Sequence, residues 1–284
     1  MWFFDAFASG FQHPTAPGQL QWFRITFGTV LTLRFALAFG QGGWERFAAT
    51  SISAHLAEQR LGPARARLLI TLYRPALIVR TAAALALACG LAPRLALLPV
   101  LAGAAMELLY LKSPNAIRYT LLTGASLLLA GDLGHGLHVE HGLSTANTWA
   151  QCLLVLITTD IYWNSAWQKL RSPQFRTGLY LAQWIHVYTQ VKDQLPYRRQ
   201  YAVPRIVRRH MGNLTDRDVR LWRLIATTVI TAEIALPPAL LIPQTMPYAV
   251  AAGIGMHVAF SCLKPRQLLT FSGLTLGTYF AFVA

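Results

Sequence analysis

Residues 222–242 read WRLIATTVITAEIALPPALLI, and this stretch decides the fold class. Only Arg223 and Glu233 can ionise within it, and its apolar length matches the ~20 residues that a helix needs to cross a bilayer. Comparable apolar runs fall at about 20–40, 68–89, 94–111, 117–131, 149–168, 247–262 and 268–284. The sequence therefore predicts an all-α polytopic integral membrane bundle of about eight transmembrane helices.

The composition excludes most other classes of protein. Of the 284 residues, 54% are hydrophobic and only 13% are charged, whereas a soluble domain carries about 25% charged residues. A water-soluble domain, a disordered chain, a coiled coil and a disulfide scaffold are all disfavoured. Tight turns such as 90–93 and 243–245 separate neighbouring runs, so we expect a single membrane-embedded domain over 1–284.

Basic residues dominate the charged ones, with 25 Lys and Arg against 11 Asp and Glu. In a membrane protein this excess marks cytoplasmic loops, so we expect no nucleic-acid partner. The loops alternate between rich and poor in Lys and Arg if the weaker run 178–191 stays on the surface. This pattern predicts a cytoplasmic segment at 169–221, both termini outside, and an inner-membrane location in a bacterium. The first residues are expected to form a short interfacial helix.

The cytoplasmic segment holds the most polar part of the chain. Its Arg205, Arg208 and Arg209 are expected to face anionic lipid headgroups, with docking of an acidic peptide or substrate as the alternative. Thr215 followed by Asp218 has the spacing of a capping box that opens the next span.

Ionisable residues inside the apolar runs are functional candidates, because burying a charge in a membrane is costly. The alternative is that they pair with one another for structural reasons. The set comprises Arg24, Arg34, Arg74, Arg80, Glu107, Asp160 and Glu233.

One helical face near the end of the fifth run carries Thr158, Tyr162, Ser165 and Lys169 at spacings of three and four. Burial disfavours the charged form of a lysine and can make it a base near neutral pH. No carboxylate lies one turn before Lys169 to hold that charge, and Asp160 projects from another face. The alternative is a lysine that extends to the headgroups from a helix end.

Two later runs carry further polar candidates. Glu233 lies mid-run, and Pro237 has no amide to bond the carbonyl of residue 233, so carboxylate and free carbonyl coincide at a predicted kink. In the next run His257 follows Gly253 and Gly255, small residues that permit close helix approach.

A metal site is not expected. His135, His138 and His141 recur at intervals of three and are weak candidates for zinc or copper. However, Gly134, Gly136 and Gly142 lie among them and predict a flexible loop. The cysteines, Cys89, Cys152 and Cys262, have no zinc-site or disulfide spacing.

Three motifs in order resemble the HTTM family, the membrane domain related to vitamin K-dependent gamma-carboxylase. The first is Tyr162-x3-Ala166-x2-Lys169-Leu170-x7-Gly178. The second is Glu233-x3-Pro237 followed by Pro243, and the third is His257-x2-Phe260 leading to Leu269-Thr270-Phe271-Ser272. The resemblance runs over roughly 20–284.

The resemblance implies an enzyme in which Lys169 deprotonates a reduced, vitamin K-like quinone. Oxygen and carbon dioxide would be co-substrates of a carboxylation, and a peptide or small acid would be modified. Tyr162 and Ser165 would orient Lys169, and Glu233, His257, Asn115, Arg118 and Asp160 would line the cavity. This chain has Asn115 where the family pattern has a histidine, so one acid–base group of that pattern is missing.

A second reading comes from a different class. The chain could be a non-catalytic quinone- or lipid-binding membrane protein, or the membrane partner of a soluble modifying enzyme. A transporter is disfavoured because no internal repeat is evident.

Overall fold

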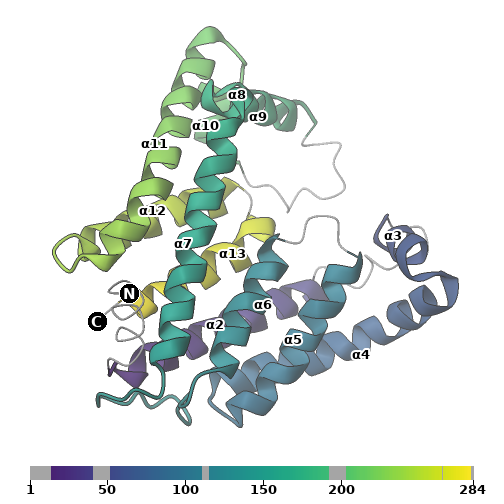
Figure 1. Cartoon of the computed structure of the whole chain (residues 1–284). Helices are drawn as coiled ribbons and strands as arrows, with labels where there is room; N and C mark the ends of the chain where they lie inside the picture. The colour runs from purple at the N-terminus through teal and green to yellow at the C-terminus, as the bar shows by residue number, and fades with distance from the viewer. Residues whose placement is uncertain (1–13, 41–51, 111–114, 192–202, 264, 283–284) are drawn as a thin grey trace, which may run out of the picture. The chain divides into compact units, whose positions relative to one another are not determined.

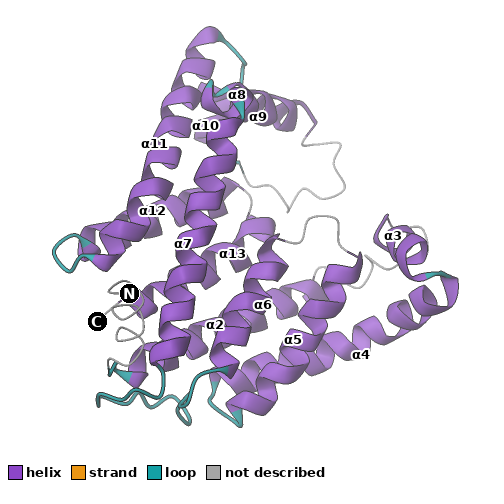
Figure 2. Cartoon of the chain, in the orientation of Figure 1, coloured by secondary structure: helices purple, strands orange, loops and turns teal. Residues whose placement is uncertain are grey.

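The computed structural model describes residues 14–40, 52–110, 115–191, 203–263 and 265–282. In these ranges the chain is drawn as helices joined by loops (Figure 2). One isolated antiparallel bridge joins Thr15 and Ser144. The predicted all-α class is confirmed. By contacts the chain divides into two compact units, Met1–Ile157 with Val283–Ala284 and Thr158–Phe282, hereafter unit 1 and unit 2. The single domain over 1–284 stays a prediction.

Unit 1 is a helical bundle in which sequence neighbours pack together (Figure 1). α2 packs on α4, α4 on α5, and α5 on α6, while α3 packs on both α4 and α5. The helices are α2 (Pro17–Gly40), α3 (Ile52–Leu61), α4 (Pro63–Ala88), α5 (Pro93–Tyr110), α6 (Asn115–Leu128) and the first part of α7 (Thr148–Arg171).

The core of unit 1 lies along one face of α2. Leu20, Phe23, Phe27 and Leu31 are fully buried and recur at spacings of three and four, which places them on one side of the helix. Gly28 lets α2 approach α4 closely, because a Cβ at that position would lie 2.5 Å from the backbone nitrogen of Ala88. Close helix contact through small residues is typical of membrane bundles.

Unit 2 holds the remaining helices. They are the rest of α7, then α8 (Pro173–Arg176), α9 (Leu179–Val191), α10 (Arg205–Met211), α11 (Asp216–Leu241), α12 (Met246–Leu263), α13 (Pro265–Thr278) and a closing 3-10 helix, η2 (Tyr279–Phe282). Thr215 caps α11 as predicted, because its side chain accepts from the backbone of Asp218 and a capping box forms. Ala182 and Ile185 of α9 pack against Trp222 of α11.

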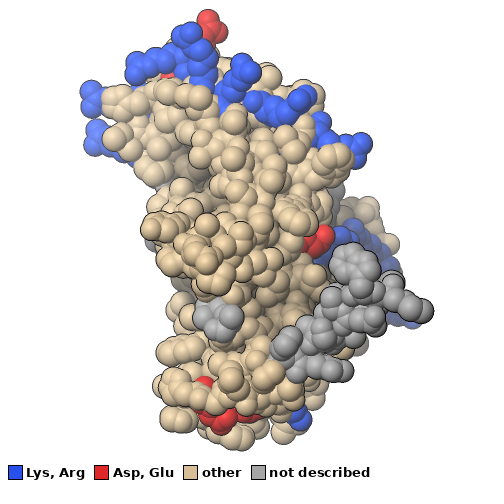
Figure 3. Space-filling view, turned by 60° about the vertical axis from the view of Figure 1, so that its left-hand side comes forward, with Lys and Arg blue, Asp and Glu red and all other residues tan. Residues whose placement is uncertain are grey.

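The basic segment forms one end of unit 2. Arg205 and Arg209 of α10 are exposed, and so are Arg217, Arg220 and Arg223 at the start of α11. Figure 3 shows Lys and Arg gathered over the end of unit 2 where α10 and α11 begin. α9 has 13 residues, so at 1.5 Å per residue it is about 20 Å long, too short for a hydrocarbon core of about 30 Å. The cytoplasmic location of 169–221 stays a prediction.

In the part of the chain that the structure describes, four helices are long and apolar enough to cross a membrane: Pro17–Phe39, Pro63–Ala88, Asp216–Leu241 and Met246–Leu263. Leu268–Phe282 is a shorter apolar stretch. These indicate a membrane protein, but eight spans are not confirmed. α6 has only 14 residues, and the second half of α7 carries Asp160, Asn164 and Gln168 among its apolar residues. The predicted interfacial helix at the N-terminus and both chain ends lie outside the described residues.

Candidate functional site

Lys169 of α7 and Glu233 of α11 form an ion pair inside unit 2. The Lys169 ammonium donates to Glu233 Oε1 and also to Ser165 Oγ, at 2.9 Å. Ser165 Oγ donates in turn to the same Glu233 oxygen at 3.0 Å. The Glu233 side chain is 5% exposed and that of Lys169 is 20% exposed. Three polar groups thus close a triangle between two helices.

Local sequence explains how each helix presents its member of the triangle. Ser165 and Lys169 are four residues apart, so their side chains lie on one face of α7. On α11 the buried positions include Trp222, Ala226, Ile230 and Glu233, again at helical spacing. Glu233 therefore lies on the face that α11 turns toward the interior of unit 2.

One of the two Glu233 carboxylate oxygens takes no part in the triangle. Glu233 Oε2 is buried and has no hydrogen-bond partner among the described residues. The rings of Phe175 and Phe260 lie 5.7 and 5.9 Å from the Lys169 ammonium. The pair therefore lies in an apolar environment, where charges are poorly solvated. In such an environment an unpaired charge costs more free energy than a neutral pair formed by proton transfer between the two groups. A buried oxygen with a free lone pair can accept a proton or a hydrogen bond from a ligand.

A second polar chain lies next to the first. Tyr162 Oη is hydrogen-bonded to His257 Nε2 at 2.8 Å and to Tyr279 Oη, and His257 Nδ1 lies 3.1 Å from Ser272 Oγ. Tyr162, His257 and Ser272 are all buried. Because the hydroxyls can donate or accept and the imidazole can carry its proton on either nitrogen, the chain can relay a proton in either direction.

Gly253 makes room for Tyr279, the last member of this hydrogen-bonded series of side chains. A Cβ at that position would overlap the Tyr279 hydroxyl and lie 2.7 Å from Tyr279 Cε2. The absence of a side chain on α12 thus admits the Tyr279 ring from η2. The sequence prediction that small residues accompany His257 to permit close approach is confirmed at Gly253.

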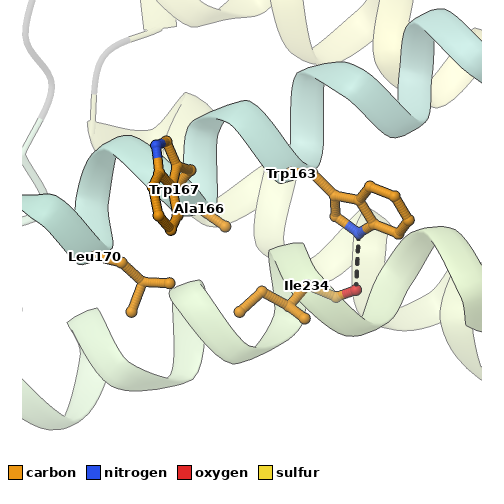
Figure 4. Close-up of a pocket in the computed structure, with 5 residues that line it drawn as sticks. All are labelled: Trp163, Ala166, Trp167, Leu170 and Ile234. Atoms are coloured by element: carbon orange, nitrogen blue, oxygen red, sulfur yellow. Dashed lines mark hydrogen bonds between the residues drawn. The ribbon is translucent and has the colours of Figure 1, made fainter.

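An apolar groove of about 220 Å³ lies between α7 and α11 (Figure 4). It is lined by Trp163, Ala166, Trp167, Leu170 and Ile234. At about 100° per residue, these α7 side chains occupy the face next to the one that carries Tyr162, Ser165 and Lys169. The groove and the ion pair therefore share the same two helices but lie on neighbouring faces.

The structure brings some of the predicted site residues together and gives others different partners. Lys169 and Ser165 meet as expected. No carboxylate lies one turn before Lys169 on α7, but Glu233 supplies one from α11. Tyr162 was expected to orient Lys169, whereas its hydroxyl is bonded to His257 and Tyr279. Spacing within one helix cannot show partners on another helix, and two opposite charges in separate apolar runs were the available signal.

The other predicted cavity residues lie elsewhere. Asn115 and Arg118 belong to α6 of unit 1 and are exposed. Asp160 is exposed on α7, on a different face from Lys169. Tyr279 was not singled out, because a tyrosine near the C-terminus carries no motif that marks it. Ser272 belongs to the third motif, but no role was assigned to it from the sequence.

The histidine loop of unit 1 is exposed at His135, His138 and His141. Within the described ranges, no group of three His, Cys, Asp or Glu residues is placed to hold a metal ion. The predicted flexible loop is instead tied to α2. Arg24 donates to the carbonyl of Gly136 at 2.6 Å, and Gln21 accepts from the backbone of Glu140 at 2.8 Å.

The fold and the site define a class, a helical membrane protein with a buried lysine–glutamate pair beside a tyrosine–histidine chain. No protein-family model, curated protein or solved structure matches this chain. The geometry of the pair and the motifs that resemble the HTTM family remain as the indications of its role.

Proposed function

We propose that this chain is a membrane enzyme whose Lys169–Glu233 pair moves a proton to and from a lipid-soluble substrate. The class is the vitamin K-dependent gamma-carboxylase-like one, acting on a reduced quinone. The single observation that carries the proposal is the buried ion pair with a carboxylate oxygen that has no partner among the described residues. Buried ionisable groups of this kind cluster at functional sites in membrane proteins.

The residues present fit a hydroquinone, which is a weak O–H acid. Glu233 Oε2 is a buried acceptor for the proton that Lys169 gives up. The Lys169 ammonium that forms again when the amine takes the hydroquinone proton would stabilise the negative charge left on the hydroquinone oxygen. Transfer of one proton from the ammonium to the carboxylate yields a neutral amine beside a carboxylic acid. An apolar setting penalises that neutral pair far less than it penalises two separated charges. The neutral Lys169 amine is the base in this proposal.

The remaining side chains have supporting tasks. Ser165 accepts from the Lys169 ammonium and fixes where its lone pair appears after deprotonation. The apolar groove with Trp163 and Trp167 offers a surface for a hydrocarbon tail. A hydroquinone and oxygen would supply the reducing equivalents and the strong base for modifying a peptide or small acid, with carbon dioxide as co-substrate if the modification is a carboxylation.

Oxygen uptake by the purified protein in lipid bilayers, with vitamin K hydroquinone added, tests the proposal. We expect uptake that Lys169→Met and Lys169→Arg both abolish, because the guanidinium of arginine stays protonated. Arg171→Met is the matched control, since Arg171 is exposed at the end of the same helix and its loss should leave uptake unchanged. Retained uptake in a folded Lys169→Arg protein would exclude Lys169 as the base.

A non-catalytic quinone or lipid binder, or a membrane partner of a soluble modifying enzyme, is the second candidate. The observation in its favour is the groove, whose five lining residues include no titratable side chain. A binder should retain the quinone on the purified protein, with Trp163→Ala and Trp167→Ala weakening retention. It should show no oxygen uptake with any hydroquinone.

A further inference from the structure

Unit 1 contains a second buried charge cluster that the proposed function does not use. Glu107 of α5 accepts from Arg80 of α4 at 2.5 Å through one carboxylate oxygen and from Arg34 of α2 at 2.8 Å through the other. The side chains of Arg80 and Glu107 are 5% and 7% exposed, and that of Arg34 is 23% exposed. Two cations thus share one anion, so the three side chains together carry one excess positive charge.

The two arginines that carry the excess charge also have N–H donors without a hydrogen-bond partner. Arg80 Nε, Arg80 Nη2 and Arg34 Nη1 are buried and have no hydrogen-bond partner among the described residues. Nε and Nη2 form one edge of a guanidinium, the edge whose two parallel N–H groups match two oxygens of one anion. Buried donors without partners cost free energy, and a buried net charge costs more. A single monoanion would satisfy both deficits.

The Arg80 guanidinium is held in place for such a contact. It lies 4.4 Å from the centre of the Phe35 ring, within range of a cation–π interaction. Gly103 of α5 leaves room for it, because a Cβ there would overlap Arg80 Cδ and Nε. The Phe35 ring of α2 and the Gly103 and Glu107 positions of α5 fix the guanidinium from two helices, so little conformational entropy is lost when a ligand binds.

The approach to the cluster is by way of Arg34, its one partly exposed member. Leu33 and Leu37 lie together on the neighbouring face of α2 and are 52% and 40% exposed, so the surface beside Arg34 is apolar. Arg34 also lies near Phe39, where the candidate span ends. An apolar surface near the end of a span meets lipid at the depth where long arginine side chains reach the headgroups.

From these observations we infer that the Arg34–Arg80–Glu107 cluster binds the phosphodiester head of an anionic membrane lipid. Its two unesterified oxygens match the free edge of Arg80, its single charge balances the cluster, and its acyl chains would lie along Leu33 and Leu37. The site lies within unit 1 and does not depend on the Lys169–Glu233 chemistry.

Lipid binding to the delipidated full-length protein in a neutral detergent tests this inference. The probes are dioleoyl phosphatidylglycerol, dioleoyl phosphatidylcholine and free glycerol 3-phosphate, read out by the thermal unfolding midpoint and by lipid retention in native mass spectrometry. Phosphatidylglycerol should raise the midpoint and be retained, because a ligand of the folded state stabilises it. Equal effects of phosphatidylcholine, or of glycerol 3-phosphate, would overturn the assignment to an anionic lipid.

Variants locate the binding. Arg34→Gln removes the excess charge and keeps the Arg80–Glu107 pair, so affinity for phosphatidylglycerol should fall ~10-fold or more, as for loss of a charged hydrogen bond. Glu107→Gln raises the net charge and should tighten binding. Arg80→Lys keeps the positive charge but removes the two parallel N–H donors, so it should weaken binding of phosphatidylglycerol. Arg74→Gln, an exposed arginine of the same helix, is the control. If the cluster variants bind like the Arg74→Gln control, the inference is wrong.

Discussion

The indole Nε1 of Trp163 donates a hydrogen bond to the main-chain carbonyl of Ile234 at 3.2 Å (Figure 4). In a regular helix that carbonyl would accept from the amide four residues later, but residue 238 is a proline and has no amide hydrogen. α11 continues through Pro237 and Pro238 to Leu241. A side chain of α7 thus replaces a hydrogen bond that the α11 sequence cannot make for itself.

Trp163→Phe keeps an aromatic ring but removes the donor, so it should lower the free energy of unfolding by about 1 kcal/mol. Pro238→Ala restores the amide hydrogen to α11, and in that background the same Trp163→Phe change should cost clearly less. Unfolding midpoints of the four proteins, measured in one detergent, complete this double-mutant cycle. Equal costs in both backgrounds would show that the Trp163 hydrogen bond is unrelated to the proline.

Removing one partner of the Lys169–Glu233 pair should destabilise the protein more than removing both. Lys169→Met leaves a carboxylate buried without its cation, which costs up to about 3–5 kcal/mol. Glu233→Gln should cost less, because the Lys169 side chain is 20% exposed and can keep part of its solvation. The double variant should regain most of the stability lost in Lys169→Met. Additive losses in thermal unfolding, with Arg171→Met as the reference, would mean that the two charges are not coupled.

Gly178 should not tolerate a side chain. Its φ is +77°, and a Cβ would lie 2.6 Å from the Trp222 carbonyl carbon and 2.7 Å from Arg223 Cα, both backbone atoms of α11. Gly178→Ala should therefore destabilise unit 2 by more than ~1–2 kcal/mol from left-handed strain alone. Gly255→Ala is the matched control, because its Cβ would meet nothing within 4 Å and helical alanine is favoured over glycine. Similar unfolding midpoints for both variants would contradict this.

The charge distribution predicts that residues 169–221 face the cytoplasm. Single cysteines at Arg208 and Ser144, introduced into a protein lacking Cys89, Cys152 and Cys262, check this in intact cells. A membrane-impermeant thiol reagent should label the cysteine at 144 and leave that at 208 unlabelled until the cells are opened. The reverse pattern would invert the topology.

Features that lie within single helices could be predicted from the sequence. The apolar runs coincide with helices, the Thr215–Asp218 capping box begins α11, and Ser165 and Lys169 share a face, because each of these depends on residues within one turn or one period. Gly178 was part of a motif with no stated role, and the structure supplies one, the contact with α11. The histidine loop was judged from its glycines alone, which carry no information about Arg24 and Gln21 of α2.

Hydrophobicity, charge and helical period by themselves determined that this is an all-helical chain suited to a membrane, and which side chains share a face. Only the tertiary structure decided that Lys169 meets Glu233, that Tyr162 meets His257 rather than Lys169, and that Arg34 and Arg80 share Glu107. The physical reason is that an apolar interior makes it costly to bury a charge without a partner of opposite charge, while the choice of partner depends on how helices distant in sequence are packed.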